Sequence, residues 1–507
     1  MRRLAVVVLL GIAFASAIML LTSGTQPAIA DPGTTERVSV DSAGREGPHD
    51  SLDPAITADG RFVVFHSWAN LAPGGTLGNS DVYVHDRQTG ITERVSVDSA
   101  GTPGSHASLR AAISADGRYV AFDSYASNLV AGDTNGYNDV FVHDRQTGVT
   151  ERVSVDSTGA QANHFSLSPG ISADGRFVVF DSEASNLVLG DTNGCSDIFV
   201  HDRQTGVTER VSVDSTGTQS NGLSHGGVVS GDGRFIAFAS YASNLVLGDT
   251  NGHRDIFVHD RQTGVTERVS VDSTGTQANH LSFPPGINAD GRFVVFESYA
   301  SNLVLGDTNG YADVFVHDRQ TGVTERVSVD SSGNEGNNLS STEGSRGVSG
   351  DGRFVAFHSQ ASNLVLGDTN ICGDQNCSDV FVHDRQTGVT ERVSVDSAGN
   401  QGNRPSQEGA VSGDGRYVAF ASEAWNLVPD DTNGTYDIFM HDRGELPQPT
   451  PTPPSVGGIV EVRRGPSAPA AQQPGSAAPP YVALAGAAAA GALALTAGAW
   501  YARRRVS

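Results

Sequence analysis

Lysine is absent from this chain of 507 residues, so its 33 basic residues are all arginine, against 57 acidic residues. The formal charge of −24 excludes nucleic acid as an expected partner, because phosphate binding needs a basic face. Hydrolase motifs of the GxSxG and HExxH types are also absent. Helical periodicity is missing between the two ends of the chain, and the 60 glycines among valine, threonine and serine favour strands and turns.

The two ends carry the apolar runs that the middle lacks. Arg2 and Arg3 precede an apolar stretch and then small residues at positions 28–30, which predicts a signal peptide over residues 1–30 and a mature chain from Asp31. An uncleaved anchor is the alternative. The sequence thus predicts a secreted protein.

A second apolar run, residues 481–501, is followed by three arginines. At 1.5 Å per residue it would span roughly 30 Å, so we predict a transmembrane helix with a cytoplasmic basic tail, residues 502–507. Residues 444–480 are rich in proline and alanine and predict an extended linker that holds an extracellular body off the membrane. Cleavage of the helix after surface sorting is the alternative, although no LPxTG motif precedes it.

A repeat of 58 residues fills the chain between these ends. The triplet HDR occurs seven times between His85 and His441, always 58 residues apart except for one interval of 66. In the second copy, runs at residues 111–114, 118–124, 139–144 and 149–156 are rich in β-branched and aromatic residues and are separated by Asp-Gly and Thr-Gly turns. These runs predict four antiparallel strands, A to D, in each unit.

Seven such units predict an all-β fold, a seven-bladed β-propeller over residues 31–443. The seventh unit ends after strand C, whereas the N-terminus carries an orphan strand D, TERVSVD, at residues 35–41. We therefore predict that this segment pairs with residues 437–442 and closes the ring as a strand latch.

The pattern ISADGRFVVFDS…DIFVHDRQTGVTERVS resembles the WD40-like (PD40) repeats of TolB-type propellers of the bacterial cell surface. Those repeats are written S-P-D-G-x-x-I-A-F followed by D-I-Y-V-x-D-x-x-T-G. The resemblance covers every unit and implies the propeller fold. This chain has Ala or Gly where the TolB-type repeat has Pro, and it lacks the separate N-terminal domain of TolB.

Strand order assigns the connections to two faces. The A–B and C–D turns share one face, here called the turn face, and the B–C loops and D–A crossovers share the other, the loop face. The HDR histidine and aspartate recur identically in all units, so we interpret them as turn and strand-end hydrogen-bonding groups. Specific binding is expected on the more variable loop face.

The B–C loops carry the motif GDTNGxxD, whose alternating oxygen ligands resemble calcium loops. Calcium is the one cofactor that this pattern suggests, and an Asx turn that leads into strand C is the alternative. The motif residues are Asp133, Asn135, Asp139; Asp191, Asn193, Asp197; Asp249, Asn251, Asp255; Asp307, Asn309, Asp313; and Asp431, Asn433, Asp437.

Three further features are candidate sites. His49, His106, His164 and His280 occupy one slot of the D–A crossover, where imidazoles could hold a metal or an anionic ligand, or simply be solvated. Trp68 and Trp425 lie in the B–C loops of the first and last units and could anchor a ligand or pack the seam between them. Cys372 and Cys377 lie in an eight-residue insertion and predict a local disulfide.

These features predict a non-enzymatic binding or scaffold propeller at the cell surface, monomeric, that presents its loop face to a protein, peptide or glycan. One alternative is a secreted glycan-active hydrolase, which needs carboxylates or a nucleophile clustered on one face. The other is a structural element of a surface layer.

Overall fold

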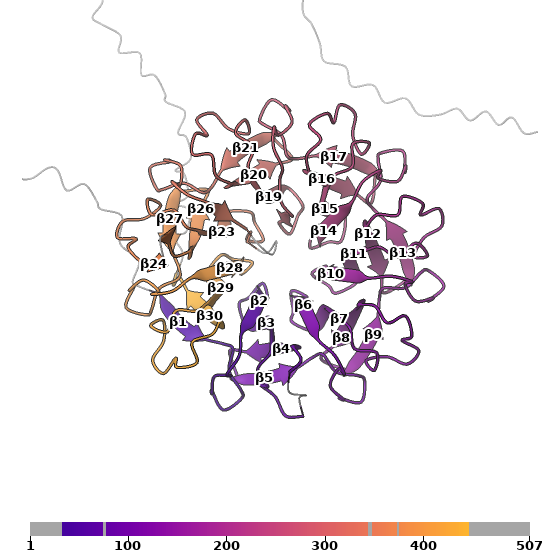
Figure 1. The fold of residues 1–507 in the computed structure, drawn as a ribbon, viewed down its shortest axis with the longest axis horizontal. Helices are drawn as coiled ribbons and strands as arrows, with labels where there is room; N and C mark the ends of the chain where they lie inside the picture. Colours follow the sequence, from indigo (N-terminus) through magenta and orange to yellow (C-terminus); the bar gives the residue numbers. More distant parts are fainter. Residues whose placement is uncertain (1–32, 75–77, 343–346, 373–374, 446–507) are drawn as a thin grey trace, which may run out of the picture. The chain divides into compact units, whose positions relative to one another are not determined.

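Seven four-stranded antiparallel sheets make up the chain where the computed structural model describes it, at residues 33–74, 78–342, 347–372 and 375–445. Each sheet is one blade, and Figure 1 shows the blades arranged radially with strand A innermost. The all-β, seven-bladed propeller is therefore confirmed. The predicted signal peptide, transmembrane helix and basic tail, and the linker beyond residue 445, lie outside the described residues.

Strands B, C and D have constant lengths around the ring, whereas strand A has six residues in five blades and two in the other two. Strand A is β2 (Ser51–Ile56), β6 (Ser108–Ile113), β10 (Ser166–Ile171), β14 (Ser224–Val229), β18 (Gly286–Ile287), β22 (Ser340–Ser341) and β28 (Ser406–Val411). Strand B is β3 (Phe62–Ser67), β7 (Tyr119–Ser124), β11 (Phe177–Ser182), β15 (Phe235–Ser240), β19 (Phe293–Ser298), β23 (Phe354–Ser359) and β29 (Tyr417–Ser422).

Strand C is β4 (Asp81–Asp86), β8 (Asp139–Asp144), β12 (Asp197–Asp202), β16 (Asp255–Asp260), β20 (Asp313–Asp318), β26 (Asp379–Asp384) and β30 (Asp437–Asp442). Strand D is β5 (Ile91–Arg94), β9 (Val149–Arg152), β13 (Val207–Arg210), β17 (Val265–Arg268), β21 (Val323–Arg326), β27 (Val389–Arg392) and, for blade 7, β1 (Thr34–Arg37). The insertion in blade 6 forms a small hairpin of β24 (Ile371–Cys372) and β25 (Gln375–Asn376). In the described part of the chain, no helix has the length and apolar character needed to cross a bilayer.

The hydrophobic core is divided among the seams between blades. Seven clusters of buried apolar side chains each join two neighbouring blades, and one of them joins blade 7 to blade 1. Strand C is buried along almost its whole length because both of its faces pack against other blades. This explains why its sequence is a continuous apolar run and does not alternate.

The N-terminal latch is present as predicted. β1 pairs antiparallel with β30, with Thr34 opposite Asp442 and Arg37 opposite Phe439. Thr35 also donates its hydroxyl hydrogen bond to the Val395 carbonyl at 2.5 Å, which ties β1 to blade 6. One blade thus contains both ends of the propeller.

The repeated HDR and DGR residues hold the turn face together. In blade 1, the Arg61 guanidinium donates two hydrogen bonds to the Asp86 carboxylate at 2.9 and 2.7 Å, and these bonds hold the pKa of Asp86 well below its usual range. The Nδ1 atom of His85 lies 2.8 Å from the Thr92 hydroxyl, and burial lowers the pKa of His85. The HDR residues His85 and Asp86 therefore both make hydrogen bonds within their own blade.

The third HDR residue bridges the seams. Arg145 of blade 2 lies over the Phe62 ring of blade 1, 4.3 Å from its centroid, and pairs with Glu93 of blade 1. The same ring leaves no room for a side chain at Gly117, where an added Cβ would lie 2.4 Å from Phe62 Cδ2. This close approach, together with a φ of 74° at Gly117, explains why the DGR turn requires glycine.

Deletion of residues 33–41 should lower the melting temperature and cause large oligomers to form. The deletion leaves the edge of β30 open to pairing with other chains. It also removes Val38 and Val40, whose burial stabilises the fold by about 1.5–3 kcal/mol each, and exposes the side chains that pack on them. Thermal unfolding and analytical ultracentrifugation would measure both effects. A chain that lacks only residues 1–30 is the control, and equal melting temperatures for the two would contradict a closing role for β1.

Candidate functional site

Two non-repeating positions of the blades lie beside the central channel near the loop face and carry ionisable side chains. The first is the third residue of strand A, where the register shifts by a bulge in five blades. The residues there are Asp53, Arg110, Ser168, Gly226 and Glu408, all with φ between 45° and 65°. For a residue other than glycine this left-handed backbone costs about 1–3 kcal/mol, and such strain is typical of functional sites.

The second non-repeating position is the fifth residue of strand B, which pairs with strand A beside the bulge. Its residues around the ring are His66, Asp123, Asp181, Ala239, Glu297, His358 and Ala421. All seven are buried, and five of them are ionisable. Strands B, C and D otherwise repeat almost unchanged, whereas strand A differs between blades at most of its positions. The two positions together bring different chemical groups to one place.

The channel itself encloses a cavity of about 570 Å³. Asp53, Arg110, Asp181 and His225 line it near the loop face. The last residues of the A strands, among them Ile56 and Ile113, line it toward the turn face. The cavity therefore has one polar end, which opens beneath the loops, and one apolar end.

Two groups of side chains interact at the polar end. The Asp53 amide donates a hydrogen bond to Glu408 Oε2 at 2.7 Å, and Asp53 Oδ2 lies 3.3 Å from Nδ1 of His66. On the other side, Arg110 Nη1 lies 3.9 Å from Asp123 Oδ1. The Asn138 amide group donates to the second oxygen of Asp123 at 3.0 Å.

Asp123 and Asp181 are buried carboxylates with unused acceptor capacity. Neither Oδ1 atom accepts a hydrogen bond from the described residues. Burial raises the pKa of each to about 7, and the positive charge of Arg110 opposes this shift only in part. The mutual repulsion of the two carboxylates adds to the rise for Asp123.

The basic residues of blade 4, His225 and Arg254, lie near the two carboxylates and interact with each other. Arg254 Nη1 lies 3.0 Å from His225 Nε2, and its Nε donates to the Ser282 carbonyl at 2.6 Å. Burial and the nearby Arg254 lower the pKa of His225 to about 4, so this imidazole is neutral at pH 7. Arg254 also lies over the Phe283 ring at 4.5 Å.

Exposed aromatic rings stand where strand B ends on the loop face. The first residue after strand B is Trp68, Tyr125, Tyr241 or Tyr299 in four blades, with 38–50% of each residue exposed. Trp68 meets His66 edge-on, with ring centroids 5.1 Å apart, so this ring adjoins the channel group. We define Trp68, Tyr125, Tyr241 and Tyr299 as the aromatic rim.

Of the two predicted tryptophans, only Trp68 belongs to the aromatic rim. Trp425 lies two residues further along its loop than the rim position, and Arg404 covers its ring at 5.0 Å. The three rim tyrosines were not among the candidates from the sequence. Alignment of the seven copies at the serine that ends strand B would have found them.

The four predicted histidines do not converge. His164 stacks on Tyr137 at 4.5 Å and lies 3.0 Å from Glu183, and His280 stacks on His253 at 4.9 Å. His49 and His106 are exposed on the loop face. No contact between any two of the four is found among the described residues, so each belongs to its own crossover.

The GDTNGxxD side chains do come together, but around an arginine. Asp133 and Asp139 lie 3.6 and 3.5 Å from Nη1 of Arg152 on strand D. Asn135 accepts the Tyr137 amide at 2.9 Å in an Asx turn and donates to Asp139. The guanidinium thus supplies a positive charge where a calcium ion was predicted, and the geometry favours the Asx-turn alternative.

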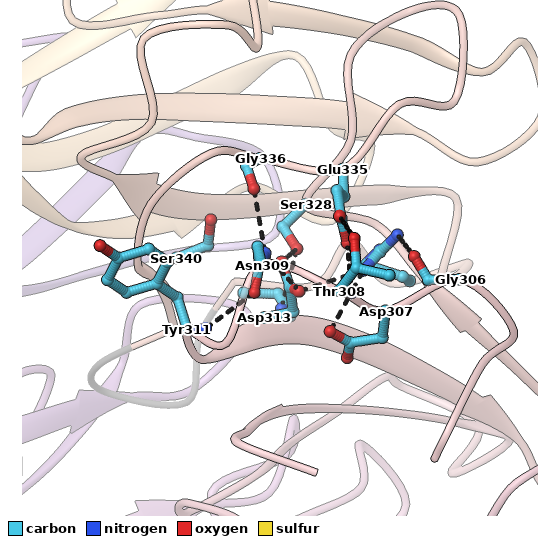
Figure 2. Close-up of polar contacts among 12 residues, drawn as sticks. Gly306, Asp307, Thr308, Asn309, Tyr311, Asp313, Ser328, Glu335, Gly336 and Ser340 are labelled. Carbon is cyan, nitrogen blue, oxygen red and sulfur yellow. Dashed lines mark hydrogen bonds and ion pairs between the residues drawn. The ribbon is translucent and has the colours of Figure 1, made fainter. Parts of the chain in front are cut away.

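Blades 5 and 7 carry a third carboxylate in this arrangement. Figure 2 shows Asp307, Asp313 and Glu335 of blade 5 beside Thr308 and Asn309. Arg326 Nη1 lies 2.8 Å from Glu335 and 3.2 Å from Asp313, and burial together with Asp313 raises the pKa of Asp307 to about 6. The equivalent group in blade 7 is Glu46, Asp431 and Asp437 around Arg37.

The remaining predicted site is covalent. A disulfide joins Cys372 to Cys377 beside the hairpin of β24 and β25. Cys195 is half-buried and forms no disulfide in the described part of the chain.

The sequence matches no known protein family and no curated protein. Solved structures similar to the chain include a putative TolB from Agrobacterium tumefaciens, at 19% identity and a TM-score of 0.34 over 55% of this chain and 80% of that one. They also include an oligogalacturonate lyase in complex with manganese, at 13% identity and a TM-score of 0.47 over 82% and 94% of the two chains. The β-propeller domain of the Trilobed protease from Pyrococcus furiosus has 11% identity and a TM-score of 0.47 over 78% and 96%.

The seven-bladed ring agrees with the expected resemblance to TolB-type propellers, and TolB proteins are among the similar solved structures. These similarities carry no conclusion about activity, so an activity must be argued from the residues of this chain.

If arginines supply the cation of the GDTNGxxD loops, EDTA will leave the melting temperature of the full chain unchanged, because no bound ion is removed. Thermal unfolding in EDTA and in excess calcium is the measurement. If excess calcium raises the melting temperature, and this rise disappears in the double variant Glu46→Gln, Glu335→Gln, the three-carboxylate groups bind the ion instead. Glutamine is a suitable replacement because Gln161 and Gln219 occupy the same crossover position.

The channel carboxylates should make the free energy of unfolding fall as pH rises. Because folding raises the pKa of Asp123 and Asp181 from about 4 to about 7, the folded chain holds protons that the unfolded chain releases in this window. The loss of stability is complete above about pH 7. The substitution Asp181→Ala, which introduces the residue found at Ala239 and Ala421, should therefore raise the melting temperature more at pH 8 than at pH 4. An equal effect at both pH values would contradict the raised pKa.

Proposed function

We propose that this protein is a non-enzymatic binding propeller of the cell surface, which presents its loop face to a protein, peptide or glycan and holds part of that ligand in the channel mouth. The observation that carries the proposal is the pair of non-repeating positions beside the channel. Different ionisable residues meet there, five of them buried on strand B, whereas strands B, C and D otherwise repeat.

The backbone supports a binding role at this place. Asp53, Arg110, Ser168 and Glu408 hold side chains at bulges whose left-handed conformation glycine adopts without strain, as Gly226 does in blade 4. A fold that needed only the bulge would be more stable with glycine at all five positions. The side chains are therefore retained for their chemistry.

The loop face also offers apolar contacts. The aromatic rim exposes four large rings that lose few degrees of freedom on binding. Four leucines at one position of the B–C loops are almost fully exposed: Leu189, Leu247, Leu305 and Leu366. Exposed rings and leucines on the face that bears the channel mouth are typical of ligand and protein contacts.

The proposed location depends on the sequence alone. A signal peptide at residues 1–30 would direct the propeller out of the cell, and a helix at residues 481–501 would anchor it through the linker. In this arrangement the ring is monomeric and extracellular, with its arginine tail in the cytoplasm.

Glycan and peptide arrays probed with the purified full chain test the proposal. We expect a ligand whose affinity falls about ten-fold or more in Trp68→Gln and Tyr241→Gln, because each change removes a ring from the aromatic rim. Blade 6 has Gln360 at this position, so the fold accommodates the replacement. Val265→Ala, at an equally exposed position on the outer strand β17, is the control and should bind normally. Equal affinity in all variants would exclude the rim as the contact surface.

A glycan-active hydrolase is the second candidate, because the Asp123 and Asp181 carboxyl groups both have a pKa of about 7 beside the cavity, and a general acid needs such a value. Chromogenic glycosides distinguish the two functions. Turnover that is lost in Asp181→Ala but persists in Trp68→Gln would favour the hydrolase, and binding without turnover favours the binding propeller.

A further inference from the structure

The buried carboxylates of blades 2 and 3 are the strongest unexplained feature of the channel mouth. Asp123 is fully buried and Asp181 is about nine-tenths buried and lines the cavity, yet the Oδ1 atom of each has no hydrogen-bond donor among the described residues. A buried carboxylate oxygen without a donor loses its hydration and gains no hydrogen bond in exchange. A ligand that donates hydrogen bonds to these oxygens would replace the lost hydration.

On the basis of the proposed function, we propose that the channel mouth recognises a protonated amino group, which binds to Asp181 on the cavity wall, with the Asp123 carboxylate buried behind it, while the ring or chain that carries it packs on the aromatic rim. An ammonium group has three donors and a positive charge, which match the free Oδ1 acceptor of Asp181 and the negative charge of the two buried carboxylates. The proposal specifies the chemistry of the ligand of the same site.

The charge balance at the site favours a cation. Asp53 and Asp181 both act electrostatically on Asp123, and Arg110 is the positive group that acts on both buried carboxylates. Arg110 Nη1 is 3.9 Å from Asp123, which is longer than a hydrogen bond, and 44% of its side chain is exposed. Arg254, the other arginine nearby, is held by His225 and Ser282. Above about pH 7, where Asp123 and Asp181 are both ionised, the site therefore has more negative charge than Arg110 neutralises.

The rim is suited to the body of the same ligand. Aromatic faces attract cations through their quadrupole and also pack against flat or aliphatic groups. Trp68, Tyr125, Tyr241 and Tyr299 follow strand B two positions after the channel residue of their own blade, on the loop face, and the Trp68 ring contacts His66 there. An ammonium group in the channel would therefore leave its carrier at the height of these rings.

Two sources carry this chemistry, an amino sugar and a lysine side chain. Isothermal titration of the full chain with a trimer of glucosamine and with its N-acetylated counterpart tests the first. Titration with a short lysine peptide and its ε-acetylated form tests the second. In each pair the acetylated form has nearly the same size but no charge, so the difference in affinity reports on the ammonium group.

We expect one charged probe to bind at least ten-fold more tightly than its acetylated partner, and this preference to disappear in Asp181→Ala. Ala239 and Ala421 occupy the same position in blades 4 and 7, so the variant should fold. The control is Glu445→Gln, which removes the same charge from an exposed position after strand C, away from the loop face. It should keep the preference.

Affinity for the charged probe should also increase as pH rises from about 6 to about 8, since Asp123 and Asp181 must lose their protons to accept the ammonium group. The groups that act on them are Arg110, which stays charged, and Asp53.

Equal binding of the charged and acetylated probes, no binding of either charged probe, or an equal loss of preference in Glu445→Gln would each overturn the inference. The proposed function fails separately, when no array ligand depends on the aromatic rim. A neutral ligand that depends on Trp68 and Tyr241 but not on Asp181 would overturn the inference and leave the binding function in place.

Discussion

Packing between blades is the constraint on which the rest of the structure depends. No blade buries its own apolar surface: each of the seven clusters takes side chains from two blades, so a sheet is stable only between two neighbours. Closure of the ring gives every blade both neighbours, and the pairing of β1 with β30 supplies the last seam. The bridges from Arg145 to Phe62 and Glu93, repeated in other blades, fix the spacing of these seams on the turn face.

The same constraint explains which parts of the fold the sequence predicted. Seams recur once per blade, so the residues that make them recur in the sequence, and the period alone led to seven blades of four strands. The latch was predictable because a missing strand D at one end and an orphan strand D at the other leave one way to complete the ring. The order of the strands then assigned the loops to their faces.

The candidate site was harder to predict because it consists of what does not recur. Asp123 and Asp181 stand at a position where other blades have alanine, histidine or glutamate, so no motif marks this position. The bulge at Arg110, with φ near 50°, is not indicated by the type of residue there either. In the GDTNGxxD loops the motif residues did meet, but the cation that they surround is Arg152. That arginine comes from strand D, beyond the motif, and was read only as part of the repeated VTER strand.

The latch also has a consequence for how the chain folds during its synthesis. β1 is the first described strand to be made and β30 the last, so the partner of β1 does not exist until more than 400 residues have been added. Blades 1 to 6 can form in order as their strands emerge, but the seam between blade 7 and blade 1 cannot. Until this seam forms, the nascent propeller is an arc with two open ends. Val63 and Phe65 remain exposed until Ile438 and Met440 are made and pack against them.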